Sequence, residues 1–255
     1  MERFPALANE LIGLKVDIIV ALNSLSGLAA KQATSTIPIV VPVMGDPVED
    51  GLVASLARPG GNVTGLTFLG PQLVPKRLAL LKEALPSASR VAVLWHPRAY
   101  GERTMDDMVA DTETAGKTLG LQLQFVAVQG PNELDRAFST IGAARVNAVM
   151  VFPSPMLFNE RTRIVDLARK LRLPLISQGK EFVELGGLMS YGADITDFIR
   201  RGATSVDKIL KGASPAELPV EQPTKFGLSI NLKTAKEIGI DIPATLLARA
   251  DQVIE

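Results

Sequence analysis

The reactive side chains in this sequence are few, and their types limit the chemistry that it could perform. The 255 residues include one histidine and no cysteine. Zinc sites built from cysteine and histidine, thiolate nucleophiles, disulfides and iron–sulfur clusters are therefore excluded. A Ser-His-Asp triad could use only His96, which follows the apolar run 91–95 and has no evident orienting partner. Its position at a strand end leaves a ligand-binding role open, but we favour the interpretation of His96 as a solvated loop residue. We expect no catalytic residue, no metal site and no cofactor.

Polar residues that could contact a small ligand occur directly after short apolar runs. They are Asn23 with Ser24, Asp46 with Pro47, and Ser154. Two interpretations of each remain open: the side chain caps a following helix, or it lies in a ligand crevice at the carboxyl end of a strand. Asp46-Pro47 also predicts a helix that begins there, with Pro47 at the first helical position. These positions indicate a crevice without identifying its ligand.

Composition and charge narrow the class of partner. The chain has 27 Lys and Arg against 27 Asp and Glu, and its pI is about 6.6. We find no basic run, so the sequence predicts no nucleic-acid partner. Hydrophobic residues make up 47% of the chain and aromatic residues 5%, which indicates an aliphatic core. The longest apolar runs, such as 146–152, fall well short of the roughly 20 residues that cross a bilayer.

The elements that must position these residues alternate between strand and helix. An amphipathic helix over 4–11 precedes the β-branched run 16–22, and helical and strand-like segments follow in turn to residue 176. This order predicts parallel sheets with helices on both faces. In 121–128, glutamines alternate with apolar residues, which predicts a sheet-edge strand. No Gly/Ser-rich linker interrupts residues 1–190, so we expect two lobes joined by strands, with a polar cleft, and favour a binding protein over an enzyme.

Longer segments carry a family resemblance. The segments are Leu28–Val40, Gly45–Val48, Gly51–Val53, Arg58–Gly65, Lys76–Leu78, Glu181–Val183, Gly186–Gly192, Gln222–Phe226 and Ile230–Lys236. Together they resemble the ABC transporter substrate-binding family that includes tryptophan-binding lipoproteins, and the resemblance covers nearly the whole chain. It implies a solute-binding component of an ABC-type importer that binds a small organic solute, such as an amino acid, in the cleft between its lobes, and delivers it to permease subunits.

The resemblance also implies a fold. It is an α/β fold of two doubly wound parallel-sheet lobes of the type I periplasmic-binding protein kind. Lobe one would comprise 1–66 and 193–218, lobe two 67–192, and the segment 219–255 would lie around a third crossing between the lobes. Hinge closure would occur near Thr64-Gly65 and Ser190–Gly192, where we expect glycines to permit the dihedral changes.

Family members begin with an export signal and further elements that have no counterpart before Glu2 here. We therefore expect an N-terminally truncated chain whose lobe one lacks its first strands. The run Val16–Leu22 would then have an open edge, which predicts self-association. By resemblance the protein is periplasmic or lipid-anchored outside the cytoplasm, although no export signal is present in this chain.

The residues expected to bind the solute come from matched motifs and from strand ends. Motif matches give Asn23, Ser24, Asp46, Pro47, Thr64 and Gly65, and strand-end position gives Ser154, Gln178 and Tyr191. Two departures from the family pattern touch the cleft: Leu25-Ser26 replaces Thr-Pro, and His96–Tyr100 replaces an Asn-Pro-rich turn. The aromatic amino acids of the family therefore cannot be assumed as ligands. A cytoplasmic small-molecule sensor and an α/β metabolic enzyme remain the alternatives.

Overall fold

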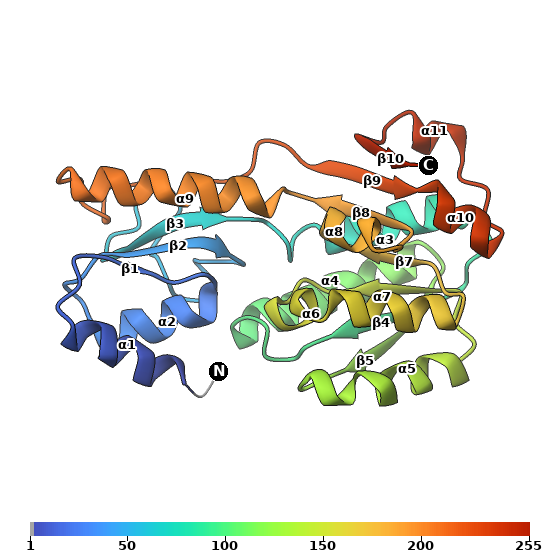
Figure 1. The fold of residues 1–255 in the computed structure, drawn as a ribbon, viewed down its shortest axis with the longest axis horizontal. Coiled ribbons are helices and arrows are strands. Elements are labelled where there is room, and N and C mark those ends of the chain that lie inside the picture. Colours follow the sequence, from blue (N-terminus) through green and yellow to red (C-terminus); the bar gives the residue numbers. More distant parts are fainter. Residues whose placement is uncertain (1–2) are drawn as a thin grey trace. The chain divides into compact units, whose positions relative to one another are not determined.

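The computed structural model describes residues 3–255 and divides the chain into two compact units (Figure 1). Unit 1 comprises Met1–Leu69, Tyr100–Thr104 and Ile195–Thr224. Unit 2 comprises Gly70–Ala99, Met105–Asp194 and Lys225–Glu255. The C-terminal segment therefore belongs to unit 2 from Lys225 onward.

Unit 1 is a small parallel sheet with helices on both faces. Its strands are β1 (Ile19–Val20), β2 (Ile39–Met44) and β3 (Val63–Thr67), in the order β1-β2-β3. Its helices are α1 (Phe4–Gly13), α2 (Ser24–Ala33) and α9 (Ile195–Leu210). Figure 1 shows α9 on one face of the sheet and α1 and α2 on the other. Ile39, Val40 and Val41 of β2 are fully buried, as expected for the central strand.

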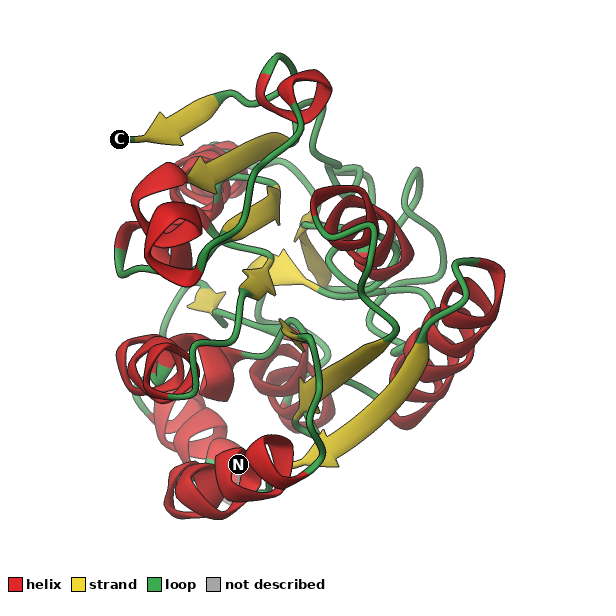
Figure 2. Ribbon diagram, turned by 90° about the vertical axis from the view of Figure 1, so that its right-hand side faces the viewer, coloured by secondary structure: helices red, strands yellow, loops and turns green. Residues whose placement is uncertain are grey.

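Unit 2 contains a sheet of seven strands in the order β10-β9-β8-β7-β6-β4-β5. The strands are β4 (Arg90–Trp95), β5 (Gln122–Ala127), β6 (Ala148–Val151), β7 (Leu175–Ser177), β8 (Met189–Gly192), β9 (Gly227–Asn231) and β10 (Gln252–Ile254). The helices are α3 (Val74–Ala84), α4 (Glu102–Thr118), α5 (Leu134–Ala143), α6 (Pro155–Asn159), α7 (Arg161–Lys170), α8 (Lys180–Glu184), α10 (Leu232–Ile238) and α11 (Ala244–Leu247), with a 3₁₀ turn at Pro131–Glu133. The start of α4, to Thr104, belongs to unit 1. Helices lie on both sides of this sheet (Figure 2).

The core of unit 2 explains why these segments form strands and helices. Branched residues of β6 pack against apolar residues of α5 and α7, among them Phe138, Ile141 and Ile164. These residues recur at helical spacing in the sequence, so each helix turns one apolar stripe toward the sheet. The predicted α/β class with mainly parallel sheets is confirmed, and β5 is an edge strand as its alternating glutamines indicate.

Four sequence-based expectations differ from the structure. Strand β9 runs antiparallel to β8, because the chain returns to the sheet from the opposite end, so the sheet of unit 2 is mixed. The strand expected over 16–22 is reduced to Ile19–Val20, with one further bridge between Asn23 and Val43. His96 is buried, with 5% of its surface exposed, because it directly follows the buried strand β4; its interpretation as a solvated residue is wrong.

The prediction that a helix begins at Asp46-Pro47 is also wrong. The chain makes one turn there, in which Asp50 N–H donates to the Asp46 carbonyl at 2.9 Å. Gly51 then adopts φ +70°, and the N–H groups of Leu52 and Val53 both donate back to the Pro47 carbonyl. The left-handed glycine ends the helical path after that turn.

Candidate functional site

In unit 1, Asn23 and Ser24 lie at the end of β1. The Asn23 Oδ1 accepts from Ser26 N–H at 3.1 Å, and Asn23 N–H donates to Ser26 Oγ at 3.2 Å, which makes a capping box for α2. Ser24 is buried, and its Oγ accepts from Gly45 N–H at 3.0 Å. The capping interpretation is therefore correct for Asn23, while Ser24 joins the start of α2 to the end of β2.

Asp46 and Pro47 shape the loop after β2. One Asp46 carboxylate oxygen accepts from the N–H groups of Val48 and Glu49, at 3.1 and 3.0 Å. Asp46 thus stabilises a turn, as an N-cap residue would stabilise a helix. We call the edge of each sheet where its parallel strands end the carboxyl edge. Because this turn directly follows β2, Asp46 lies at the carboxyl edge of unit 1, beside the residues that end β1.

Asp50 is a polar residue of this loop that sequence reasoning missed. Its Oδ1 accepts from Thr104 Oγ1 at 2.6 Å and from Gly101 N–H at 3.1 Å, whereas its Oδ2 is buried without a hydrogen-bond partner. Burial raises the pKa of the Asp50 carboxyl, and the hydroxyl of Thr104 opposes that increase. No sequence signal could have found Asp50, since an aspartate before a glycine in a turn is common.

Thr64 and Gly65 are committed to packing inside unit 1. Thr64 is buried, and its Oγ1 donates to the Leu218 carbonyl at 2.8 Å. Gly65 has φ +146°, and a Cβ there would lie 2.0 Å from the Val41 carbonyl oxygen. Gly192 is similar, because a Cβ would lie 2.3 Å from the Gln178 carbonyl oxygen. Close approach of neighbouring backbones therefore explains why both positions are glycine.

In unit 2, Ser154 and Tyr191 also lie at the ends of strands. Ser154 is buried and caps α6, with its Oγ accepting from Leu157 N–H at 3.3 Å. The Tyr191 carbonyl accepts from Nε of the buried Arg77 at 2.7 Å, and its ring lies 6.1 Å from that of Phe226. The Tyr191 side chain is half-buried, so part of it faces solvent.

An aromatic cluster lies at the end of β4. Trp95 contacts Phe125 edge-to-face at 6.3 Å between ring centroids, and Phe125 contacts Phe152 in the same way at 6.1 Å. The Trp95 indole Nε1 is buried without a hydrogen-bond partner. Burial, and secondarily the charge of Arg98, lower the pKa of the neighbouring His96, which favours its neutral form.

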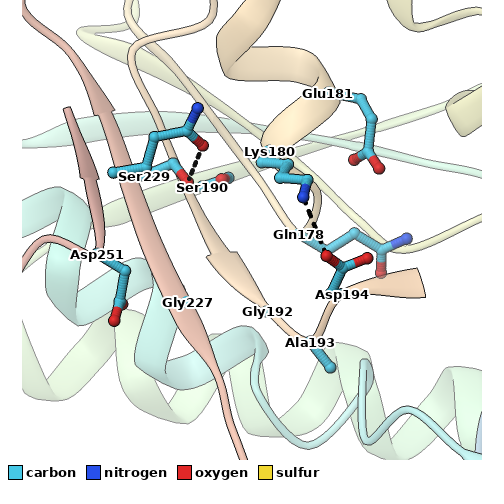
Figure 3. Close-up of a pocket in the computed structure, with 11 residues that line it drawn as sticks. Gln178, Lys180, Glu181, Ser190, Gly192, Ala193, Asp194, Gly227, Ser229 and Asp251 are labelled. Atoms are coloured by element: carbon cyan, nitrogen blue, oxygen red, sulfur yellow. Dashed lines mark hydrogen bonds and ion pairs between the residues drawn. The ribbon is translucent and has the colours of Figure 1, made fainter. Parts of the chain in front are cut away.

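Gln178 lines a cavity of about 220 Å³ in unit 2 (Figure 3). The cavity lies where the end of β8 meets the starts of β9 and β10, which run from the same edge of the sheet. Its lining consists of Gln178, Lys180, Glu181, Ser190, Gly192, Ala193, Asp194, Gly227, Ser229, Asp251 and Gln252. The Gln178 Oε1 is buried and lacks a hydrogen-bond partner.

Among the described residues, three buried side-chain atoms lack a hydrogen-bond partner: Asp50 Oδ2, Trp95 Nε1 and Gln178 Oε1. Each lies at a carboxyl edge: Asp50 in the loop after β2, Trp95 at the last residue of β4, and Gln178 directly after β7. Buried polar atoms are normally satisfied by protein, water or ligand. One of them lies in unit 1 and two lie in unit 2, and each position matches the rule that ligands of parallel sheets bind beyond the carboxyl ends of strands.

Two kinds of site lack support in the part of the chain that the structure describes. No group of three or more His, Asp or Glu residues within 3–255 is arranged to hold a metal ion. Within the same residues, no helix has the length and apolar character needed to span a membrane.

Comparisons with known proteins agree with one another. The sequence model described as "ABC transporter substrate binding protein" matches residues 2–254. The tyrosine-binding protein of Clostridioides difficile strain R20291 is 26% identical over 234 residues, which cover 91% of this chain and 66% of that protein. The chain thus spans just under two thirds of the length of this curated relative.

Two solved structures are also similar. An ABC domain from Streptococcus pneumoniae in complex with L-Trp has a TM-score of 0.89 and 26% identity, with 99% of this chain and 86% of that one covered. A conserved domain protein from Vibrio cholerae has a TM-score of 0.89 and 28% identity, with coverages of 98% and 82%. The type I periplasmic-binding fold expected from the sequence is confirmed.

Proposed function

This chain belongs to the ABC transporter substrate-binding protein family, and we propose that it is the solute-binding component of an ABC-type importer. Its proposed solute is a small organic molecule, and an amino acid is the favoured class. The proposed partners are the permease subunits that receive the solute. Members of the family act outside the cytoplasm, and we place this protein in the periplasm or at the outer face of a membrane through a lipid anchor.

The observation that carries this proposal is the match of the family model to residues 2–254, together with the fold shared with the L-Trp complex at a TM-score of 0.89. The L-Trp complex and the tyrosine-binding relative support an amino acid as the class of solute.

The contribution of each predicted residue follows from its contacts. The carboxyl edge of unit 1 is shaped by Asn23, Ser24, Asp46 and Pro47. That of unit 2 is shaped by Ser154, Gln178 and Tyr191. Thr64 and Gly65 act indirectly, by fixing β3 in its place beside β2. Asp50 and Trp95 join the proposed set because of their unpartnered atoms.

We propose that the solute leaves unchanged, without catalysis. His96 is buried and its pKa is lowered, and the described residues provide it with no carboxylate hydrogen-bond partner. An enzyme that used His96 as a base would need such an orienting group. Binding without turnover is what a delivery protein requires.

A thermal-shift screen against amino acids, sugars and nucleotides tests the proposal, because a ligand of the folded state raises the melting temperature by mass action. We expect amino acids to raise it most, with one-to-one binding by calorimetry. The stabilising compound is then recovered and analysed after long incubation. Conversion to a product would favour an α/β enzyme, and stabilisation by nucleotides alone would contradict the assignment to amino acid uptake.

A further inference from the structure

We propose that Arg77 is a positioning residue of unit 2. It holds together segments that lie next to the points where the chain passes between the two units, and through Tyr191 it fixes part of the proposed solute site. The reference to a solute rests on the proposed function. The inference is argued from the burial of Arg77, its two backbone partners and a strained residue beside one of them.

The position of Arg77 is unfavourable for the helix that carries it. Arg77 is the fourth residue of α3 and follows Lys76, and the first turn of α3 contains no acidic residue. The N-terminus of a helix carries partial positive charge, so a cation in the first turn is locally unfavourable. A local conflict of this kind indicates that contacts with the rest of the fold decide the residue.

Arg77 makes these contacts with two backbone carbonyls outside α3. Its side chain is buried, with 1% of its surface exposed. The Arg77 Nε donates to the Tyr191 carbonyl at 2.7 Å, and its Nη1 donates to the Gly70 carbonyl at 3.0 Å. Hydrogen bonds from a charged donor are stronger than neutral ones, and the guanidinium is planar and rigid. The two carbonyls are therefore held in a fixed relation to each other.

Both carbonyls lie close to points where the chain passes between the units. Three of these passages are at 69–70, 194–195 and 224–225. Gly70 directly follows the first passage, and Tyr191 lies shortly before the second. The Tyr191 ring lies 6.1 Å, between centroids, from the ring of Phe226, which follows the third passage. Arg77 and Tyr191 thus connect the unit 2 side of all three passages.

The backbone at the first passage is strained. Leu69 has φ +53°, in the left-handed region, which is unfavourable for a residue as bulky as leucine. Such a conformation persists only when the surrounding structure imposes it. The hydrogen bond from Arg77 to the carbonyl of the next residue, Gly70, is one contact that does so. We therefore expect the dihedral changes of closure to fall at Leu69 and after Gly192, while Tyr191 keeps its place.

Tyr191 connects Arg77 to the proposed solute site. Its carbonyl is held by Arg77, its ring lies beside that of Phe226, and its side chain is half-buried. Pairing with Leu228 of β9 holds the same residue in the sheet. Loss of Arg77 leaves this pairing in place but releases the end of β8 on the side of α3. Binding of a solute then has to order the Tyr191 ring, which weakens the affinity.

The first measurement is amide hydrogen exchange of the whole chain without solute. Arg77→Met removes both donors and keeps an unbranched side chain in the buried position. We expect exchange in 70–73 and 189–193 to become at least about tenfold faster, beyond any uniform change across β4 and β6. Lys76→Met, at the exposed neighbouring position of α3, should leave these rates unchanged. Uniform acceleration across unit 2, or no acceleration, would overturn the proposal.

The second measurement is calorimetric binding of the common L-amino acids, with L-tryptophan and L-tyrosine first. We expect Arg77→Met to raise the Kd of any that binds wild type by about tenfold, the effect of losing one hydrogen bond to a charged group. Arg77→Lys should raise it less, because lysine keeps the charge but lacks the planar fork. A lower melting temperature with an unchanged Kd would show a purely structural role and contradict the positioning role.

A second variant keeps the test decisive if Arg77→Met does not fold. Phe226→Leu removes the ring beside Tyr191 and leaves Arg77 in place. We expect faster exchange in 189–193 and binding weakened about threefold, since an aromatic pair contributes about that much. Wild-type exchange and affinity in a folded Phe226→Leu variant would count against the connection through Tyr191.

The positioning role and the proposed function fail separately. If an amino acid binds wild type and Arg77→Met equally, the function stands and the positioning role is wrong. If exchange accelerates locally in Arg77→Met but no amino acid binds wild type, Arg77 holds these segments as proposed and the proposed solute class is wrong.

Discussion

At the scale of single residues, Asp50 is an acid whose surroundings favour its neutral form. Burial raises its pKa above the ordinary value of 3.8. Because the folded protein then holds the proton more tightly than the unfolded chain, the free energy of unfolding falls as the pH rises from the unfolded pKa through the folded one. Asp50→Asn should remove this loss and become more stable relative to wild type toward neutral pH. Urea unfolding at several pH values measures this difference in the free energy of unfolding.

Two variants control this measurement. Asp50→Ala removes the acceptor for Thr104 and Gly101 and should cost about 1–3 kcal/mol at low pH. Because it also removes the titrating carboxyl, it should show the same change with pH relative to wild type as Asp50→Asn. Asp17→Asn changes an exposed carboxylate and should leave the pH profile parallel to that of wild type. If Asp50→Asn and Asp17→Asn show the same profile, Asp50 has no special role in the pH dependence of stability.

At the scale of elements, β1 is an edge strand with an exposed apolar residue. The N–H groups of Ile19 and Ala21 donate toward β2, so the peptide groups of the intervening Val20 point to the other side. Among residues 3–255 no strand pairs there, and Val20 is 58% exposed. We propose that this edge pairs with a second copy of the chain, and expect Val20→Lys to shift the protein toward monomer in sedimentation velocity experiments.

The matched substitution Leu210→Lys, at the exposed end of α9, should leave self-association unchanged. Identical sedimentation of wild type and both variants over a wide concentration range would contradict the role of β1. The proposed self-association depends on the unpaired side of β1. A strand that paired with this side would prevent it.

Element order was predictable from the sequence, and element pairing was not. Apolar spacing identified most helices and the parallel strands, because period alone shows which face of a segment is buried. Period does not show which strands pair, so the antiparallel match of β8 with β9 was missed. The turn at Asp46 was misread as a helix because its end depends on the dihedral angles of Gly51. The burial of Asp50 and Trp95 depends on distant contacts and leaves no local signal.

At the scale of the whole molecule, each unit carries its own carboxyl edge. The predicted lobe boundaries and solute-contacting residues remain predictions. We expect a saturating amino acid solute to slow amide hydrogen exchange in loops 21–26 and 45–50 of unit 1 and in loops 95–99 and 177–180 of unit 2. Mass spectrometry of peptides reports each loop. Protection confined to one unit would contradict the participation of both.

Trp95 is the single tryptophan of the chain, and it lies at a carboxyl edge. The protein thereby contains one indole fluorophore, which can be excited selectively over its two tyrosines, at the place where the solute is proposed to bind. A solute lacking an indole should change the emission of Trp95 in proportion to occupancy, so that affinity and stopped-flow rates become measurable without a label. Emission that stays constant while calorimetry reports binding would place the solute away from β4. Fluorescence of the unmodified chain thus reports solute binding directly.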